Sequence, residues 1–339
     1  MPYTITQRIL SSIDPENLEI TLLPTEQCNF RCTYCYEDFS IGKMNRETIN
    51  SIKNLLVHRV KTIKRLNLQW FGGEPLAAKS IMYEISAFAK TLCAEHGVFF
   101  SGATTTNGYL LDIDTATRLH DLDQRGYQIS LDGFASVHDS TRRLASGDGT
   151  FDRIINNLRT IRDSKLPISV LLRIHLSIDN QQSLKQLAKM LRSEFLHDKR
   201  FSIFLKPIEN LGGPNSSQIK AIDKDNRKNR IQEIEEILYN NVVSTNIHSV
   251  ENLQICYASK PNSLVIRADG RVQKCTVLLS DDRNTVGNLT PDGRIHLNNS
   301  LMVNWMRGYL TGDRDILRCP AINIPKIQKS KIIPIAQVV

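Results

Sequence analysis

Three cysteines stand within eight residues near the start of the chain, in the segment PTEQCNFRCTYCYED. They are Cys28, Cys32 and Cys35, in a C-x3-C-x2-C pattern. Such short spacers let a single stretch of chain present three thiolates to three irons of a cubane [4Fe–4S] cluster. Because no fourth cysteine is nearby, one iron would stay open to a ligand from outside the protein. The pattern therefore predicts an iron–sulfur loop.

A structural zinc site is the alternative interpretation of the same cysteines. Closed zinc sites normally need four protein ligands, and the nearest further candidate is His58, within a predicted helix. The aromatic residues Phe30, Tyr34 and Tyr36 alternate with the cysteines and would shield a cluster from water. The pattern favours the cluster over zinc.

The cysteine loop follows the first of six predicted strands. Short β-branched runs predict strands at 19–23, 68–71, 98–105, 127–131, 168–175 and 201–206. Apolar residues three or four apart predict the intervening helices at 46–66, 81–96, 115–122, 153–163 and 183–195. This alternation indicates an α/β fold with parallel strands and crossover helices. Six units are too few for a closed eight-fold barrel, so a partial barrel or an open doubly wound sheet is expected.

The pattern changes after about residue 209. A loop precedes a polar helix predicted at 221–243, and two strand–turn–strand units with D-G turns follow at 263–275 and 286–297. These units indicate a small C-terminal α+β extension. The predicted division is an N-terminal segment at 1–18, a barrel at 19–210, a linker helix at 211–250 and the extension at 251–339.

Composition narrows the class of protein. The chain has 339 residues, a net charge of +8, 41% hydrophobic residues and seven cysteines. It holds no run of eighteen apolar residues and no apolar signal segment at its start, so a cytoplasmic protein without a membrane span is expected. The basic residues form only short clusters, which are typical of solvated helix faces, so nucleic acid is an unlikely partner. Cys93, alone in an apolar helix, is expected in the core.

The segment CNFRCTYCY resembles the signature loop of the radical S-adenosylmethionine (SAM) superfamily. The resemblance covers about residues 19–210: FGGEP at 71–75, TTNGYLL at 105–111 and SLDG at 130–133 are similar to motifs at its second, third and fourth strand ends. The segment at 138–158 resembles the branch that modifies peptides and proteins. The resemblance implies a partial (β/α)6 barrel and SAM bound to the open iron through its amino and carboxylate groups. It also implies an oxidoreductase-type enzyme that cleaves SAM reductively to a 5′-deoxyadenosyl radical, which then abstracts hydrogen from the substrate.

The same resemblance implies a set of SAM ligands. They are Tyr34, Gly72, Gly73, Glu74, Asn107, Ser130, Asp132, Arg142 and Arg173. The glycines would let the backbone approach a ligand closely. Arg142 or Arg143, or Arg173 on the fifth strand, would hold the SAM carboxylate. Two alternatives stay open: a role in a turn alone for Asp132, and pairing with a buried acid for Arg173.

The later cysteines resemble the start of a SPASM/twitch extension, which carries auxiliary [4Fe–4S] clusters. Cys256 and Cys275 are joined as C-x13-G-x4-C, and Cys319 stands where the next cysteine group should begin. A full extension would carry more cysteines, whereas residues 320–339 contain none, so the extension is predicted to be incomplete. Two alternatives are open: these three cysteines hold one auxiliary cluster, or the clusters have been lost.

The expected substrate follows from the peptide-modifying branch. It is a ribosomally made precursor peptide, with a crosslink, a thioether or an epimerised residue as the product, and flavodoxin or ferredoxin as the electron donor. Sulfatase maturases share the architecture but typically place an aspartate after the cysteine that corresponds to Cys275, where this chain has Thr276. Oxidation of a protein side chain as in those maturases, a small-molecule substrate, and an impaired homologue that acts as a binding protein are the alternatives.

Overall fold

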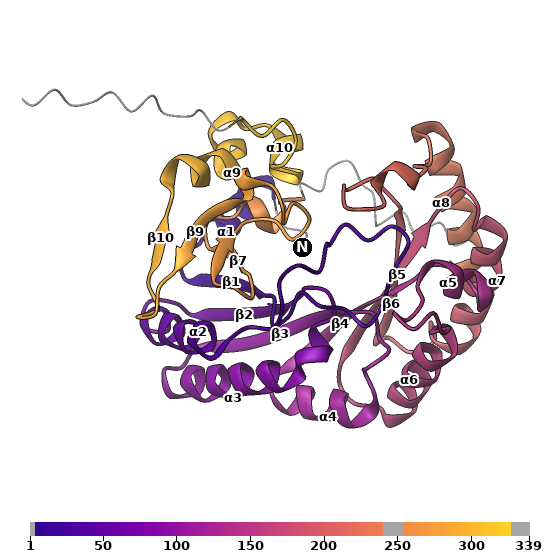
Figure 1. The fold of residues 1–339 in the computed structure, drawn as a ribbon, viewed down its shortest axis with the longest axis horizontal. Coiled ribbons are helices and arrows are strands. Elements are labelled where there is room, and N and C mark those ends of the chain that lie inside the picture. The colour runs from indigo at the N-terminus through magenta and orange to yellow at the C-terminus, as the bar shows by residue number, and fades with distance from the viewer. Residues whose placement is uncertain (1–3, 240–253, 327–339) are drawn as a thin grey trace, which may run out of the picture.

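One sheet runs through the chain from the cysteine-loop strand to both edges. The computed structural model describes residues 4–239 and 254–326, and its ten strands lie in the order β10-β9-β8-β7-β1-β2-β3-β4-β5-β6. The six barrel strands are parallel and follow chain order: β1 (Asn17–Leu22), β2 (Arg65–Trp70), β3 (Phe99–Thr106), β4 (Gln124–Leu131), β5 (Ser169–Leu176) and β6 (Phe201–Pro207). The sheet curves without closing (Figure 1), which confirms the predicted α/β partial barrel.

Helices cover the outer face of these strands (Figure 1). They are α2 (Arg46–Arg59), α3 (Lys79–Glu95), α4 (Ile113–Asp121), α5 (Ser136–Thr141), α6 (Phe151–Ser164), α7 (Gln181–Glu194) and α8 (Lys224–Tyr239). Each crossover helix buries one apolar stripe, as α6 does with Ile154, Leu158 and Ile161. Residues 240–243 of the predicted linker helix lie outside the described residues.

The boundary between the first helix and the second strand differs from the prediction. The helix expected at 46–66 ends at Arg59, and β2 already begins at Arg65. Leu66, Leu68 and Trp70 are buried in alternation. A period of two is typical of a strand. The two leucines at the start of this segment concealed that period in the sequence.

The C-terminal strands extend the barrel sheet. They are β7 (Ser263–Ile266), β8 (Arg271–Gln273), β9 (Thr285–Leu289) and β10 (Ile295–Leu297). The two predicted hairpins are present as the antiparallel pairs β7–β8 and β9–β10. β7 pairs in parallel with β1, with Ile20 opposite Leu264, so the sheet is continuous across the predicted domain boundary. The domain division itself stays a prediction.

Several short elements complete the fold. Four of the described helices were not predicted from the sequence: α5, α1 (Ile5–Ser12), α9 (Asn299–Thr311) and α10 (Arg314–Arg318). The described 3-10 turns are η1 (Pro75–Ala78), η2 (Ser216–Gln218), η3 (Tyr257–Ser259) and η4 (Asp282–Asn284). α1 lies beside the C-terminal elements (Figure 1), where the Ser12 and Tyr309 hydroxyls are 2.8 Å apart. Among the described helices, none has the length and apolarity that crossing a bilayer requires.

A buried ion pair joins the start of the cysteine loop to the turn after β7. The side chains of Glu26 and Arg267 are almost fully buried. Arg267 Nε donates to Glu26 Oε1 at 3.1 Å, a second guanidinium nitrogen donates to Oε2, and the third donates to the Leu279 carbonyl at 2.8 Å. Because all three guanidinium nitrogens are bonded, the pair fixes the cysteine loop against the C-terminal strands.

Replacing Arg267 with alanine is expected to lower the free energy of unfolding by about 3–5 kcal/mol, because the carboxylate of Glu26 would stay buried without its partner. Chemical denaturation measures this change. The matched control is Arg271→Ala at the start of β8, which breaks an exposed pair with Asp269 in the β7–β8 turn and should cost less than about 1 kcal/mol. Equal effects of the two substitutions would contradict the structural role of the buried pair.

Candidate functional site

One cavity at the carboxyl ends of the barrel strands collects most of the predicted site residues. The predicted residues that line it are Cys28, Cys32, Cys35, Tyr34, Gly72, Gly73, Asn107, Ser130, Arg142 and Arg173. Ligand sites of α/β barrels form at this end of the strands. The two predicted ligands that do not line this cavity are Glu74 and Asp132, which are buried.

The cysteine loop leaves β1 and is attached to the connection between β4 and α6. The amide of Arg31 donates to the Arg143 carbonyl at 2.9 Å, and the amide of Thr33 donates to the Thr141 carbonyl at 3.0 Å. Within the loop, the Phe30 amide donates to Cys28 Sγ at 3.3 Å. These bonds hold the three cysteines along one wall of the cavity.

Burial controls the charge of the cysteine thiols. It raises the pKa of Cys28 to about 12, with the carboxylate of Glu74 adding to the rise, and it raises the pKa of Cys35 to about 11. The pKa of Cys32 is also raised by burial, against the nearby charge of Arg142. These thiols are therefore protonated at neutral pH and must release protons when they bind iron.

The donor set fits an iron–sulfur cluster. Three soft sulfur donors from one loop face a common cavity lined by aromatic residues. Within residues 4–239 and 254–326, no three Cys, His, Asp or Glu side chains are placed to share a single metal ion. The thiolates of a cubane bind different irons, so they need not converge on one point. His58, the candidate fourth zinc ligand, lies on α2, where its Nε2 is 3.0 Å from the Asp292 carbonyl.

The two glycines of FGGEP let the end of β2 pack against the cysteine loop. Gly72 has φ +117°, and a Cβ built there would lie 2.2 Å from the Thr25 carbonyl oxygen. A Cβ on Gly73 would lie 2.6 Å from the Gln27 carbonyl oxygen. The sequence analysis predicted a close approach of backbone to ligand. The structure adds a close approach of backbone to backbone, which only glycine permits.

Glu74 organises the ends of β2 and β3 beneath the cavity. Its carboxylate accepts hydrogen bonds from the Leu76 amide at 2.9 Å, the Thr106 hydroxyl at 2.8 Å and the Asn107 amide at 2.7 Å. Asn107 Nδ2 in turn donates to Asn29 Oδ1 in the cysteine loop at 2.8 Å. Glu74 therefore positions residues of the cavity wall, and its direct contact with SAM stays a prediction.

Asp132 is the centre of a second buried network. Its Oδ1 accepts from the Tyr34 hydroxyl at 2.8 Å and from His175 Nδ1 at 3.0 Å, and its Oδ2 accepts from the Thr141 hydroxyl at 2.8 Å. Burial alone would raise the pKa of Asp132, but the hydrogen bond from His175 and the charge of Arg142 hold that pKa well below its usual range. Asp132 therefore carries its negative charge at neutral pH, and it bonds three other side chains in addition to standing at a turn.

His175 is a cavity residue that the sequence analysis missed. It lies two positions after Arg173 on β5, so both side chains emerge on the same face of the strand. Burial lowers the pKa of His175, so its ring is neutral at neutral pH. With Nδ1–H donating to Asp132, Nε2 is left as an acceptor. Alternation along β5 was the signal that would have identified it.

The three candidate arginines have different surroundings. Arg142 is buried, lines the cavity and donates through NH1 to the Tyr34 hydroxyl at 2.8 Å, whereas Arg143 is exposed. Arg173 also lines the cavity, and it makes no hydrogen bond or ion pair with any residue in the described part of the chain. Within the part of the chain that the structure describes, Arg173 therefore does not pair with a buried acid.

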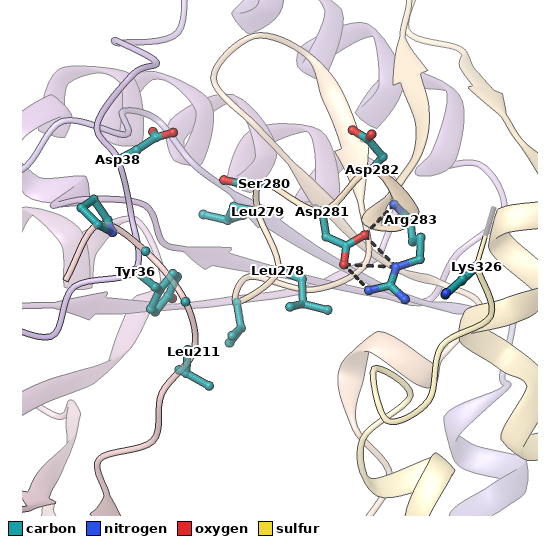
Figure 2. Close-up of a pocket in the computed structure, with 14 residues that line it drawn as sticks. Tyr36, Asp38, Leu211, Leu278, Leu279, Ser280, Asp281, Asp282, Arg283 and Lys326 are labelled. Atoms are coloured by element: carbon teal, nitrogen blue, oxygen red, sulfur yellow. Dashed lines mark hydrogen bonds and ion pairs between the residues drawn. The ribbon is translucent and has the colours of Figure 1, made fainter. Parts of the chain in front are cut away.

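A second cavity of about 880 Å³ adjoins the first. Tyr36 and Leu211 line both cavities. Figure 2 shows these two residues on one side of the second cavity and the segment from Leu278 to Arg283 on the other. The Tyr36 hydroxyl donates to the Thr276 carbonyl at 3.1 Å, which ties the cysteine loop to the residue after Cys275.

The C-terminal cysteines are brought close together by the fold. Cys256 precedes η3, Cys275 follows β8, and Cys319 ends α10. Burial raises the pKa of Cys256 to about 11, and the neighbouring Cys275 and Cys319 add to the rise. The amide of Cys256 also donates to the Leu317 carbonyl at 2.9 Å. Cys93, by contrast, is packed in the core as predicted.

The chain matches one protein family by sequence. The family model described as the radical SAM superfamily matches residues 22–191. A cysteine-type anaerobic sulfatase-maturating enzyme from Clostridium novyi (strain NT) is 22% identical over 292 residues, which cover 79% of this chain and 75% of that relative.

Two solved structures share the fold. Native anSMEcpe with bound AdoMet and Kp18Cys peptide has a TM-score of 0.63 at 16% identity, covering 90% of this chain and 88% of that chain. Streptococcus suis SuiB bound to precursor peptide SuiA has a TM-score of 0.56 at 13% identity, covering 82% of this chain and 64% of that chain.

Replacing Gly73 with alanine is expected to displace the cysteine loop, because the new methyl group would overlap the Gln27 carbonyl. Overpacking of this kind costs about 1–3 kcal/mol, measurable by thermal or chemical unfolding, and iron content after reconstitution should fall with it. Gly42→Ala is the matched control, since a Cβ there has no neighbour within 4 Å. Full iron loading in the Gly73 variant would contradict this packing role.

Replacing Cys275 with alanine tests the predicted auxiliary cluster. If Cys256, Cys275 and Cys319 hold one, the wild-type protein should bind about eight irons per chain and the variant about four, because each cubane contains four. Iron analysis and Mössbauer spectra measure the loss. Equal iron content at about four per chain in both proteins would show that only the Cys28–Cys35 loop is loaded.

Proposed function

The chain belongs to the radical SAM superfamily, and we propose that it modifies a ribosomally made precursor peptide. It is therefore an enzyme whose cofactors are a [4Fe–4S] cluster and SAM. When both are bound, reductive cleavage of SAM supplies a 5′-deoxyadenosyl radical that abstracts hydrogen from the substrate. The remaining steps of the proposal concern what the residues of this chain hold, orient and exclude.

Different residues of the cavity would hold the cluster and SAM. Cys28, Cys32 and Cys35 would hold three irons, and the adjoining Phe30 and Tyr36 keep water from the cluster. Arg142 has a buried Nε without a partner in the described structure and stands at the cysteine-loop end, so it suits the SAM carboxylate. The Tyr34–Asp132–His175 network keeps this wall rigid.

The observation that carries the peptide proposal is the pair of adjoining cavities. A reacting side chain that enters the cysteine cavity past Tyr36 and Leu211 would leave its flanking residues in the second cavity (Figure 2). The second cavity, at about 880 Å³, has room for such flanking residues. Two relatives of the same fold were solved with peptides, which supports this proposal. The product would be a crosslink, a thioether or an epimerised residue.

Electrons would come from an external donor such as flavodoxin or ferredoxin. The net charge of +8 favours an acidic partner of this kind. An auxiliary cluster on Cys256, Cys275 and Cys319 would lie among the C-terminal elements of the chain. This part of the proposal is independent of the peptide substrate.

A second candidate is oxidation of a protein side chain, as the similarity to the sulfatase-maturating relative suggests. The residue after Cys275 weighs against it. Thr276 has no ionisable group, its hydroxyl lies 2.8 Å from the Tyr257 hydroxyl, and its amide donates to the same oxygen at 2.8 Å. Thr276 therefore cannot supply the carboxylate that the resemblance implies for those maturases.

The anaerobically reconstituted protein is expected to form 5′-deoxyadenosine from SAM when dithionite is supplied, as measured by liquid chromatography. Cys32→Ala should lose product formation by at least about 100-fold, since the loop then offers two thiolates to the cluster. Cys93→Ala is the matched control, because it removes a buried core cysteine distant from the loop in sequence and should retain the activity.

Two outcomes would count against the proposal. Absence of 5′-deoxyadenosine from fully loaded wild-type protein, with and without peptide, would contradict the proposed radical chemistry. Product formation that responds to a small metabolite but to no peptide would support the radical chemistry and contradict the peptide substrate.

A further inference from the structure

Two arginines line the cysteine cavity, and their surroundings differ. The Arg142 guanidinium lies 5.8 Å from the centre of the Phe30 ring in the cysteine loop and donates to Tyr34. Arg173 stands on β5, in register with Ser130 on β4 and Phe204 on β6. The two guanidiniums therefore serve different parts of the cavity.

We propose that Arg173 on β5, with Lys206 on the neighbouring strand β6, binds a carboxylate of the substrate. This inference rests on the proposed function and adds the chemical class of the group that is recognised: the side chain of an acidic residue or a free peptide carboxyl terminus. Arg173 is thereby reassigned from the SAM ligands that the sequence predicted to a substrate subsite.

The first argument is that SAM has a single carboxylate. In the arrangement that the resemblance implies, this carboxylate lies on the open iron, next to the cysteine loop. Arg142 is the arginine at that place, because its charge acts directly on Cys32 and its Nε is buried with no partner in the described structure. Arg173 is then left without an anion among the described residues.

The second argument is the local charge at the β5–β6 end of the cavity. Lys206 Nζ is 2.6 Å from Glu209 Oε2, and Arg227 NH1 is 3.2 Å from Glu209 Oε1, so two cations share one carboxylate. Arg173 adds a third positive charge, and its Nε is buried without a partner among the described residues. A half-buried cation without an anion is costly, so the free protein has an incomplete site.

The remaining acid in the cavity wall does not complete this site. Glu37 lies beside the buried Glu26–Arg267 pair, and its Oε2 makes no hydrogen bond in the part of the chain that the structure describes. The cavity therefore has a cationic end at β5–β6 and a separate acidic position near the C-terminal strands.

The number of free donors selects a carboxylate. The guanidinium of Arg173 has no acceptor among the described residues, and the ammonium of Lys206 keeps donors beyond its one bond to Glu209. One guanidinium presents two parallel donors that match a carboxylate and balances a single negative charge.

The first measurement is SAM affinity, by equilibrium dialysis of the reconstituted protein. Arg142→Gln should raise the Kd for SAM about tenfold or more, as for a lost charge-assisted hydrogen bond. Arg173→Gln should leave that Kd within about twofold, as should the control Lys199→Gln, which removes an exposed positive charge elsewhere. If Arg173→Gln weakens SAM binding as strongly as Arg142→Gln, Arg173 is a SAM ligand and the inference is wrong.

The second measurement uses defined tripeptides on the SAM-loaded protein, with affinities determined by NMR titration. The probes are N-acetyl-alanyl-glutamyl-alaninamide, its glutaminyl and phosphoseryl counterparts, and N-acetyl-trialanine with a free carboxyl terminus. A carboxylate peptide should bind at least about fivefold more tightly than the glutaminyl peptide, corresponding to one charge-assisted pair. Arg173→Gln should abolish this preference, Arg173→Lys should restore part of it, and Lys199→Gln should keep it.

The probes also separate the sources of the carboxylate. Preference for the glutamyl peptide indicates an acidic side chain, and preference for the free acid indicates a chain terminus. Equal affinities, no binding by any probe, or tighter binding of the phosphoseryl peptide would overturn the inference. Because neither measurement requires turnover, failure here leaves 5′-deoxyadenosine formation as a separate test of the proposed function.

Discussion

The pairing of β1 on both of its edges is the constraint on which the rest of the structure depends. β2 joins one edge and β7 joins the other, both in parallel, so the loop that leaves β1 emerges between the barrel and the C-terminal strands. The Glu26–Arg267 pair reinforces this position at the first residues of the loop. As a result, one face of the cysteine loop borders the barrel cavity, and Tyr36 on the same loop borders the cavity formed with the C-terminal segment.

Buried carboxylates make this arrangement rigid from below. Glu74 and Asp132 each follow a barrel strand, and each binds groups from other segments that line the cavity. Their lone pairs are used within the protein, so the cavity surface is formed by the residues that they hold. A polar network of this kind keeps a unique geometry only while each member is bonded, which explains why motif residues lie beneath the site as well as on its surface.

Much of this organisation could be predicted from the sequence. The six parallel strands, the cysteine loop and the glycines of FGGEP are local patterns, because periodicity and spacing are recorded in neighbouring residues. The pairing of β7 with β1 could not be predicted, since it joins positions 20 and 264 and no local pattern records it. His175 was missed because a lone histidine carries no motif and only its alternation with Arg173 along β5 marks it. Glu74 was assigned to SAM alone, because the sequence does not reveal which hydrogen bonds its carboxylate already makes within the protein. The helix predicted at 46–66 overran the start of β2, because the leucines there suit the period of a helix as well as that of a strand.

The same long-range pairing has a consequence for how the chain is synthesised. During translation β1 and β2 emerge early, whereas β7 follows only after the whole barrel, so one edge of β1 stays unpaired for most of synthesis. An open strand edge is a place where other chains can add. The cysteine loop lies next to the same edge, and its Glu26 has no ion-pair partner until Arg267 has been synthesised. The cysteine loop therefore reaches its final packing only after β7 and Arg267 have been synthesised.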